Sequence, residues 1–198
     1  MFIKMNQNNK ILMLATGNSH KVKELKKVFR ELDIEISCQP EGLNVEESGS
    51  TYLENARMKA ITVAKLTGYW TLADDSGLEI DALGGAPGIY SARYAPDDNQ
   101  KINRILNELK GNYYRSASFN TFISLANPIG QTIIESQGIC KGEILEAPSG
   151  VGPGYDSIFW VKEAGMTYAR MPEHVKNKIG SRGKATKAIV RNLKCCLS

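Results

Sequence analysis

The stretch Leu72–Tyr94, LADDSGLEIDALGGAPGIYSARY, places two adjacent aspartates after an apolar run and before a glycine-rich segment. Trp70–Ala73 is typical of a short buried strand, and residues 78–82 alternate between apolar and acidic side chains as a second strand does. Asp74–Gly77 is therefore predicted to be a turn, because Asp, Ser and Gly favour turns. Paired carboxylates can also ligate Mg²⁺ or accept a proton from water. The stretch alone fits both a plain hairpin turn and a reaction centre.

The length and composition predict one folded domain with a modest positive charge. The chain has 198 residues, and 25 Lys and Arg against 21 Asp and Glu give a formal charge of +4. This excess suits a small anionic substrate, whereas no dense basic run indicates nucleic-acid binding. The four cysteines lack CxxC spacing, which favours a reduced protein without a zinc site. Without a membrane span or a secretory signal, we expect a cytoplasmic protein that binds no membrane.

A polar loop between a strand and a helix is a candidate anion site near the N-terminus. Lys10–Ala15 is typical of a buried strand, and Lys21–Leu32 carries apolar residues at helical spacing. The loop TGNSHK, at 16–21, would direct the backbone N–H groups of the helix toward an anion, and Lys21 would add a positive charge. An ordinary N-cap by Asn18 or Ser19 fits the same residues, so the local sequence leaves both readings open.

The segments that follow predict a mixed sheet with helices around it. Thr51 and Glu54 have capping-box spacing, which predicts a helix whose Lys59 contacts either an anionic substrate or, as local sequence favours, solvent. Ala117–Ala126 and Thr132–Ile139 are typical of strands joined by a four-residue hairpin turn. Such a hairpin makes the sheet of an α/β fold mixed.

Two segments near the C-terminus could contact a ligand. The loop PSGVGPG, at 148–154, leads into Tyr155 and Asp156, which could contact a base or a sugar, although a flexible connector is the alternative. Ser181 is predicted to cap a terminal helix. Lys176 and Arg182 lie at the entrance of this helix, where cationic side chains and N–H groups could bind an anion or a carbonyl oxygen.

Taken in order, a series of motifs resembles those of the inosine triphosphate pyrophosphatase family: TGNSHK, EESGSTYLENARMKA, ADDSGLEIDALGGAPGIYSARY, GPGYDSIFWV and KNKIGSRGKA. The resemblance implies an α/β fold with an elongated mixed β-sheet flanked by helices, and two lobes with a central cleft. It also implies Mg²⁺-dependent hydrolysis of ITP, dITP and XTP to the monophosphate and pyrophosphate, in a homodimer. We expect a flexible N-terminus at 1–9, a single domain at 10–194 and a frayed C-terminus at 195–198.

The resemblance also implies roles for individual residues. Asp75 would be the proton acceptor and a metal ligand, with Asp74 as its catalytic support. The second metal ligand would be Glu46, with Glu47 as the competing assignment. The implied substrate contacts are Thr16, Gly17, Asn18, Lys21, Lys59, Ser76, Gly154, Tyr155, Asp156, Lys176, Ser181 and Arg182.

Three residues depart from the family pattern close to the expected base. Pro153 stands where an aromatic residue is usual, Ser181 replaces a histidine, and Arg170 stands where an acidic residue is common. We therefore expect a higher Michaelis constant or looser base selection than is usual in the family. The same departures support an alternative function, that of a non-catalytic or altered-specificity nucleotide-binding homologue.

Overall fold

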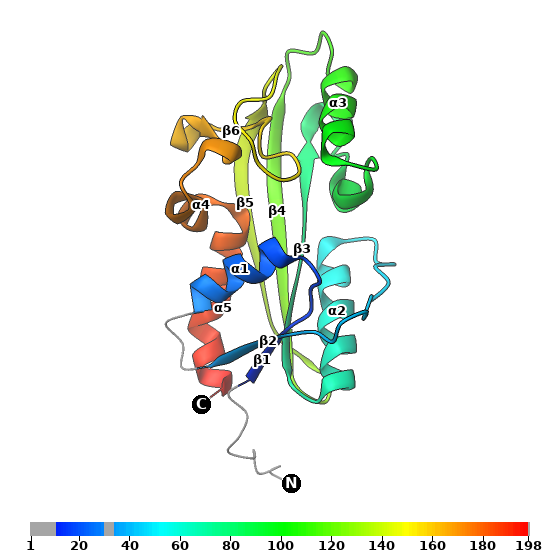
Figure 1. Ribbon diagram of the computed structural model, residues 1–198, viewed down its shortest axis with the longest axis vertical. Coiled ribbons are helices and arrows are strands. Elements are labelled where there is room, and N and C mark those ends of the chain that lie inside the picture. Colours follow the sequence, from blue (N-terminus) through cyan, green and yellow to red (C-terminus); the bar gives the residue numbers. More distant parts are fainter. Residues whose placement is uncertain (1–10, 30–33, 198) are drawn as a thin grey trace. The chain divides into compact units, whose positions relative to one another are not determined.

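The computed structural model describes residues 11–29 and 34–197 of the chain (Figure 1). The predicted flexible N-terminus at 1–9 and the last residues of the helix predicted at 21–32 lie outside these ranges. The final helix continues to Leu197, beyond the domain end predicted at 194.

Seven strands of the described chain form one sheet, in the order β2-β1-β3-β4-β5-β6-β7. β1 pairs in parallel with both β2 and β3, whereas β6 pairs antiparallel with both β5 and β7. The sheet is therefore mixed, and the predicted α/β class is confirmed. The strands are β1 (Ile11–Leu14), β2 (Glu35–Cys38), β3 (Trp70–Ile80), β4 (Ser116–Ala126), β5 (Thr132–Ile144), β6 (Phe159–Val161) and β7 (Met166–Thr167).

The helices fall close to the segments with helical periodicity. α2 shows the N-cap predicted at Thr51, whose side chain accepts a hydrogen bond from the Glu54 amide, and the helix ends at Gly68, which has a φ of 71°. Among the described residues, no helix has the length and apolar character needed to cross a bilayer. The helices are α1 (Ser19–Val28), α2 (Tyr52–Thr67), α3 (Asp98–Glu108), α4 (Glu173–Ile179) and α5 (Ser181–Leu197).

The described chain divides into two compact units. Unit 1 consists of the described parts of Met1–Asp75, Phe122–Gln137 and Ala185–Ser198, and unit 2 of Ser76–Thr121 and Gly138–Lys184. Each unit has its own buried apolar core. Two units agree with the two lobes that the family resemblance implies.

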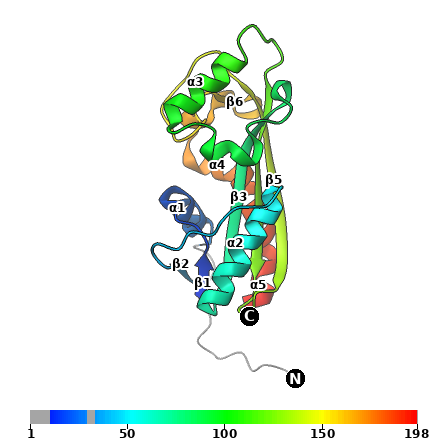
Figure 2. The same cartoon turned by 90° about the vertical axis from the view of Figure 1, so that its right-hand side faces the viewer.

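In unit 1, helices cover both faces of the sheet (Figures 1 and 2). Leu12, Leu14 and Leu72 pack with residues of α1 and α5 on one face. On the other face, Met13 and Ala73 pack with residues of α2. Side chains alternate between the two faces along each strand, so even-numbered positions of β3 in this unit face α1 and α5, and odd-numbered positions face α2.

In unit 2, three aromatic rings in mutual contact join separate segments of the chain. The ring of Phe119, on β4, lies 4.8 Å from that of Phe159 on β6 and 5.2 Å from that of Tyr168, which lies in a short 3₁₀ helix. Phe159 and Tyr168 are buried, with Phe119 partly buried beside them. Edge-to-face and offset ring contacts of this kind stabilise a core beyond the area that they bury.

The predicted turn at Asp74–Gly77 is wrong, because β3 continues without interruption from Trp70 to Ile80. Every side chain of this strand is buried or half-buried, and β3 lies between β1 and β4 in the sheet. Backbone pairing on both sides outweighs the turn preference of Asp, Ser and Gly, which is a weak local tendency. By contrast, the predicted hairpin turn between β4 and β5 is confirmed by a hydrogen bond from the Asn127 amide to the Gln131 carbonyl.

Candidate active site

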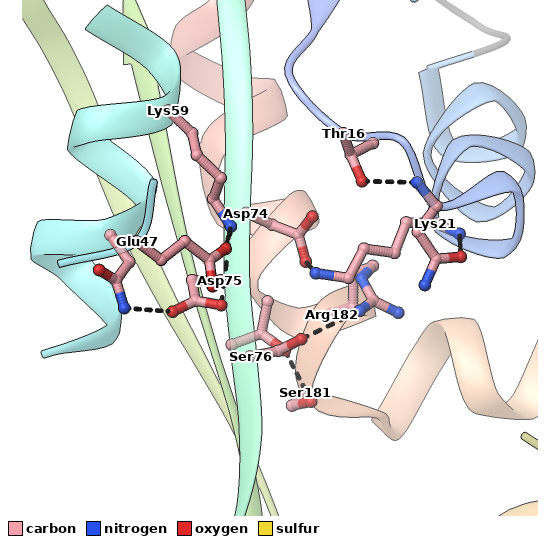
Figure 3. A network of polar contacts seen from close by, with 12 residues as sticks. Thr16, Lys21, Glu47, Lys59, Asp74, Asp75, Ser76, Ser181 and Arg182 are labelled. Atoms are coloured by element: carbon pink, nitrogen blue, oxygen red, sulfur yellow. Dashed lines mark hydrogen bonds and ion pairs between the residues drawn. The ribbon is translucent and has the colours of Figure 1, made fainter. Parts of the chain in front are cut away.

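Two adjacent carboxylates on β3 belong to opposite faces of the sheet in unit 1. Asp74 occupies an even-numbered position, on the side of α1, and Asp75 an odd-numbered position, on the side of α2. The Asp74 side chain is fully buried, and that of Asp75 is 11% exposed. Figure 3 shows a lysine reaching each aspartate from its own side of the strand. The two carboxylates therefore have separate partners.

Asp74 is paired with Lys21, in the first turn of α1. Lys21 Nζ lies 2.9 Å from Asp74 Oδ2, and the lysine side chain is 18% exposed. The loop before α1 is fixed by local bonds, because the Asn18 amide donates to Thr16 Oγ1 and Asn18 Oδ1 accepts from the Lys21 amide. The N-cap reading of Asn18 is confirmed. Phosphate contacts by Thr16, Gly17 and Asn18 stay a prediction, with Gly17 and Asn18 exposed.

Asp75 lies in a polar network with residues of α2. Asn55 Nδ2 donates to Asp75 Oδ2 at 3.1 Å, and Lys59 Nζ lies 3.7 Å from Asp75 Oδ1. The same ammonium group lies 2.6 Å from Glu47 Oε1. The expectation that Lys59 stays in solvent is wrong, because its side chain is only 12% exposed.

Burial and neighbouring charge shift the pKa values of this network in a consistent way. Burial raises the pKa of the Asp75 carboxyl, and the charge of Lys59 offsets only part of the shift. For Lys59, burial lowers the pKa, but the charges of Asp75 and Asp74 and the hydrogen bond to Glu47 outweigh it, so that the pKa is raised. Asp75 thus gains affinity for a proton while Lys59 keeps its charge.

The carboxylates that contact Lys59 are of a type that can bind a divalent cation. Glu47 and Asp75 both contact the Lys59 ammonium group, which shows that their oxygens converge on one positive charge. Carboxylate oxygens are the ligands that Mg²⁺ prefers. Glu46, the predicted ligand, is exposed, whereas Glu47 is half-buried. Among the described residues, no three His, Cys, Asp or Glu side chains gather as a preformed metal cluster.

In unit 2, the residues at the start of α5 are held by hydroxyl groups. Arg182 donates from Nη2 to Ser76 Oγ at 3.1 Å. The Ser181 hydroxyl is buried and lies 2.9 Å from Thr121 Oγ1. The predicted cap by Ser181 is wrong, because Ser181 is the first residue of α5 and the Gly180 carbonyl already accepts from the Lys184 amide.

The segment Gly154–Asp156 is fixed at each of its three residues in unit 2. The Gly154 amide donates to Asp98 Oδ2 at 2.7 Å, and Asp156 Oδ2 lies 2.5 Å from Lys176 Nζ. The Tyr155 ring is 4% exposed within the core, and its hydroxyl donates to the Ser91 carbonyl at 2.8 Å. Burial also raises the pKa of Tyr155. The side chain of Tyr155 therefore stabilises the core of unit 2. The groups of this segment that could contact a ligand are its backbone and the Asp156 side chain.

Asp98 is the residue of this region that the sequence did not single out. Its sequence context, Pro96-Asp97-Asp98, marks the start of a helix, and either aspartate fits an N-cap. In the structure Asp97 caps α3 by accepting from the Gln100 amide, and Asp98 instead reaches Gly154. No local pattern predicts that contact.

The fold and the lysine–carboxylate network define an α/β protein with buried acidic residues on a central strand. The sequence model of the Ham1 family matches residues 12–192, and the chain belongs to this family. A dITP/XTP pyrophosphatase of Nostoc sp. is 45% identical over 190 residues, covering 96% of this chain and 97% of the relative. One of Prochlorococcus marinus is 47% identical over 188 residues, covering 94% and 95%.

Solved structures of the family show the same fold. The HAM1 protein from Coxiella burnetii matches with a TM-score of 0.86 at 39% identity, covering 93% of this chain and 98% of that chain. The Staphylococcus aureus Ham1 protein matches with a TM-score of 0.84 at 36% identity, with the same coverage. The family and fold class predicted from the motifs are confirmed.

Proposed function

We propose that the chain hydrolyses non-canonical purine nucleoside triphosphates, such as ITP, dITP and XTP, to the monophosphate and pyrophosphate. The observation that carries the proposal is the pair of buried aspartates on β3, each held by a lysine from a different helix. A triphosphate carries several negative charges, and fixed lysines stabilise such charge well in a site of low dielectric constant. The names of the relatives, dITP/XTP pyrophosphatases, support the substrate class.

The phosphate contacts would come from unit 1. Lys21 and Lys59 each supply a positive charge that can reach phosphate oxygens, and the amides of Gly17 and Asn18, with the Thr16 hydroxyl, supply neutral donors. Both lysines already have fixed positions, so little side-chain entropy is lost on binding. These donors are in place before the reaction, so they would stabilise the negative charge that develops in the transition state.

Asp75 is the proposed proton acceptor. A water molecule attacks the α-phosphorus and forms a new phosphorus–oxygen bond, while the bond from this phosphorus to the bridging oxygen breaks and pyrophosphate leaves. Asp75 takes the proton that the water loses. Its raised pKa favours this transfer, because a carboxylate with greater proton affinity is a stronger base.

The proposed cofactor is Mg²⁺, held by Asp75 and by one of the two glutamates before α2. When bound, this ion would neutralise phosphate charge and raise the acidity of a water molecule. The motif resemblance assigns the second ligand to Glu46, whereas the contact with Lys59 supports Glu47. Lys59 contacts both Glu47 and Asp75, so it would also help to hold these two carboxylates in place.

Base recognition is proposed to depend on unit 2. Hypoxanthine and xanthine present a carbonyl oxygen where adenine presents an amino group, so donors aimed at this position reject adenine. Arg182, which Ser76 holds, is the candidate donor, and Gly154, Asp156 and Lys176 are further contacts. Ser181 belongs to the same proposed contact set, although its hydroxyl already pairs with Thr121. Pro153 in place of an aromatic residue removes about 1–3 kcal/mol of stacking.

The test is a pyrophosphate-release assay on ITP, dITP, XTP, GTP and ATP, each with and without Mg²⁺. We expect Mg²⁺-dependent release from the first three nucleotides and little from ATP. Binding of ITP without release would instead support the alternative, a non-catalytic homologue, which the departures at Pro153 and Arg170 favour. Turnover of a different nucleotide class would support altered specificity.

We also propose that the protein is a cytoplasmic homodimer, without nucleic-acid or membrane partners. The motif resemblance supports the dimer, and the modest charge and the cysteine spacing support the compartment. Sedimentation velocity at several protein concentrations measures the assembly directly. A species of monomer mass at all concentrations would contradict the dimer.

A further inference from the structure

The loop Pro148–Gly154 of unit 2 is tied to its surroundings at both ends. Near its start, the Ser149 amide donates to the Ser157 carbonyl at 2.8 Å, and the Ser149 carbonyl accepts from Thr167 Oγ1 at 2.7 Å. At its end, the Gly154 amide donates to Asp98. Between these ends, Val151 is 95% exposed, whereas Gly150 and Gly152 lie close to Ala169. The conformation of the loop therefore depends on these hydrogen bonds and on its packing against Ala169.

The contact at Gly154 is a charge-assisted hydrogen bond from its backbone amide to Asp98, a residue outside the loop. Asp98, in the first turn of α3, accepts from the Gly154 amide through Oδ2 at 2.7 Å, a short distance typical of a carboxylate acceptor. Its other oxygen, Oδ1, lies 3.1 Å from Lys101 Nζ. The bond from Gly154 is also the main reason that the pKa of Asp98 is lowered. Asp98 is thus held on both oxygens.

Gly154 is the point where the chain turns from the loop into the core. Its φ of 59° lies in the left-handed region, which a glycine adopts without strain. The next residue, Tyr155, is fixed in the core, and Asp156 is fixed by Lys176. The bond to Asp98 is therefore made at the residue that joins the loop to this fixed segment.

We propose that Asp98 is a positioning residue for nucleotide recognition, which rests on the function proposed above. Its carboxylate orients the Gly154 peptide, and through it the segment Pro153–Asp156. Because Pro153 provides no aromatic ring and the Tyr155 ring is buried, this segment recognises the base through backbone groups and Asp156. Backbone groups have no side-chain freedom to correct a displaced loop, so their placement depends on the contacts of the loop, and at Gly154 the contact from outside the loop is the hydrogen bond to Asp98.

The neighbouring Asp97 offers a matched control. Both oxygens of its side chain accept from Gln100, one from the backbone amide as the N-cap of α3, so Asp97→Ala removes a cap and keeps the bond from Gly154 to Asp98. Asp98→Ala removes the bond to Gly154. Asp98→Asn retains a side-chain oxygen that can accept the same hydrogen bond without the charge.

The experiment combines amide hydrogen exchange at Gly154, followed by NMR, with steady-state hydrolysis of ITP. For Asp98→Ala we expect Gly154 exchange to accelerate by at least about tenfold, and the KM for ITP to rise on the order of tenfold with kcat changed less than about twofold. In Asp98→Asn, the Gly154 exchange rate and the KM should return most of the way to their wild-type values. In Asp97→Ala, the exchange rate and the KM should stay at the wild-type level, while Tm should fall.

The inference would be overturned by Gly154 exchange at the wild-type rate in Asp98→Ala, or by an equal change of KM in Asp97→Ala and Asp98→Ala. A fall in kcat without a change in KM would also contradict a positioning role. If the wild-type protein releases no pyrophosphate from any nucleotide, the proposed function fails, and the exchange rates alone then decide whether Asp98 positions the loop.

Discussion

The lysine–carboxylate network of unit 1 and the Gly154 segment of unit 2 use different kinds of interaction. In unit 1, the ammonium groups of Lys21 and Lys59 meet the buried carboxylates Asp74 and Asp75. In unit 2, a backbone amide meets Asp98, and Ser76 holds Arg182 through a hydroxyl. The first arrangement suits the stabilisation of charge, and the second suits the recognition of a neutral base. With the function proposed above, we expect substitutions in the two regions to alter the chemistry and the base selectivity separately.

The two regions should also differ in how strongly a substitution acts. Loss of one partner from a buried ion pair leaves an uncompensated charge, at a cost of about 3–5 kcal/mol. The bonds of Asp98 and Arg182 in unit 2 are only part-buried, and a hydrogen bond to a charged group contributes about 1.5–3 kcal/mol. The changes with the largest effects on turnover are therefore expected in unit 1.

The largest effect is expected for Asp75→Asn. The amide cannot accept the proton of the attacking water, so kcat for ITP should fall on the order of a hundredfold or more. The fold should remain, because Asn can still accept from Asn55 and the substitution removes a charge that burial disfavours. Stopped pyrophosphate assays and circular dichroism measure both quantities. Asp81→Asn, at an exposed acidic residue, is the control, and near-normal turnover of Asp75→Asn would refute its role.

The second largest effect is expected for Asp74→Asn, which tests whether Asp74 positions Lys21 or acts as a second base. Asp74→Asn removes the buried partner of Lys21, so the KM for ITP should rise by about tenfold and the free energy of unfolding should fall by about 3 kcal/mol. The double variant Asp74→Asn with Lys21→Met should regain part of the stability without regaining affinity. Denaturant titration supplies the free energies. A fall in kcat alone, as large as that of Asp75→Asn, would instead identify Asp74 as a base.

A smaller effect, on the Mg²⁺ concentration needed for activity, should distinguish the two candidate metal ligands, Glu46 and Glu47. If Glu47 is the ligand, Glu47→Gln should raise the Mg²⁺ concentration for half-maximal activity by about tenfold, and Glu46→Gln should have little effect. If Glu46 is the ligand, the order is reversed, and Glu47→Gln mainly loosens Lys59. Each variant is the control for the other. Equal, small shifts in both would contradict a glutamate ligand before α2.

The smallest effect concerns the pH profile. Burial raises the pKa of Asp75 and the charge of Lys59 lowers it in part, and the activity should be lost as pH falls and Asp75 becomes protonated. Lys59→Met removes the opposing charge and should move this acidic limb of kcat/KM to higher pH. Lys65→Met, a lysine at the other end of α2, is the control. An acidic limb that stays in place in Lys59→Met would show that Asp75 does not set it.

Much of the fold and of the charged site could be predicted from the sequence. Capping residues such as Thr51 and the hairpin turn near Asn127 act through neighbours in the chain, so their patterns were reliable. The motifs also identified Asp74 and Asp75. Their division between two faces of the sheet follows from strand periodicity, but only once the strand is known to continue through Gly77.

The remaining errors concern residues whose environment comes from distant parts of the chain. Lys59 is held by Glu47 and Asp75, so local sequence placed it wrongly in solvent. The ligand contact of Tyr155 stays a prediction, but the sequence did not show that its ring lies in the core and that its hydroxyl donates to the Ser91 carbonyl. The contact of Asp98 could not be predicted from the sequence. Its partner is a backbone amide, and every residue except proline has one, so no residue type marks the partner.

The most direct test of the central claim, attack of water on the α-phosphorus, is hydrolysis of ITP in water labelled with heavy oxygen. Mass spectrometry of the two products then shows which phosphorus received the new oxygen. The account predicts the label in the monophosphate and unlabelled pyrophosphate, with the reaction lost in Asp75→Asn. Label in the pyrophosphate, or release of inorganic phosphate in its place, would contradict it.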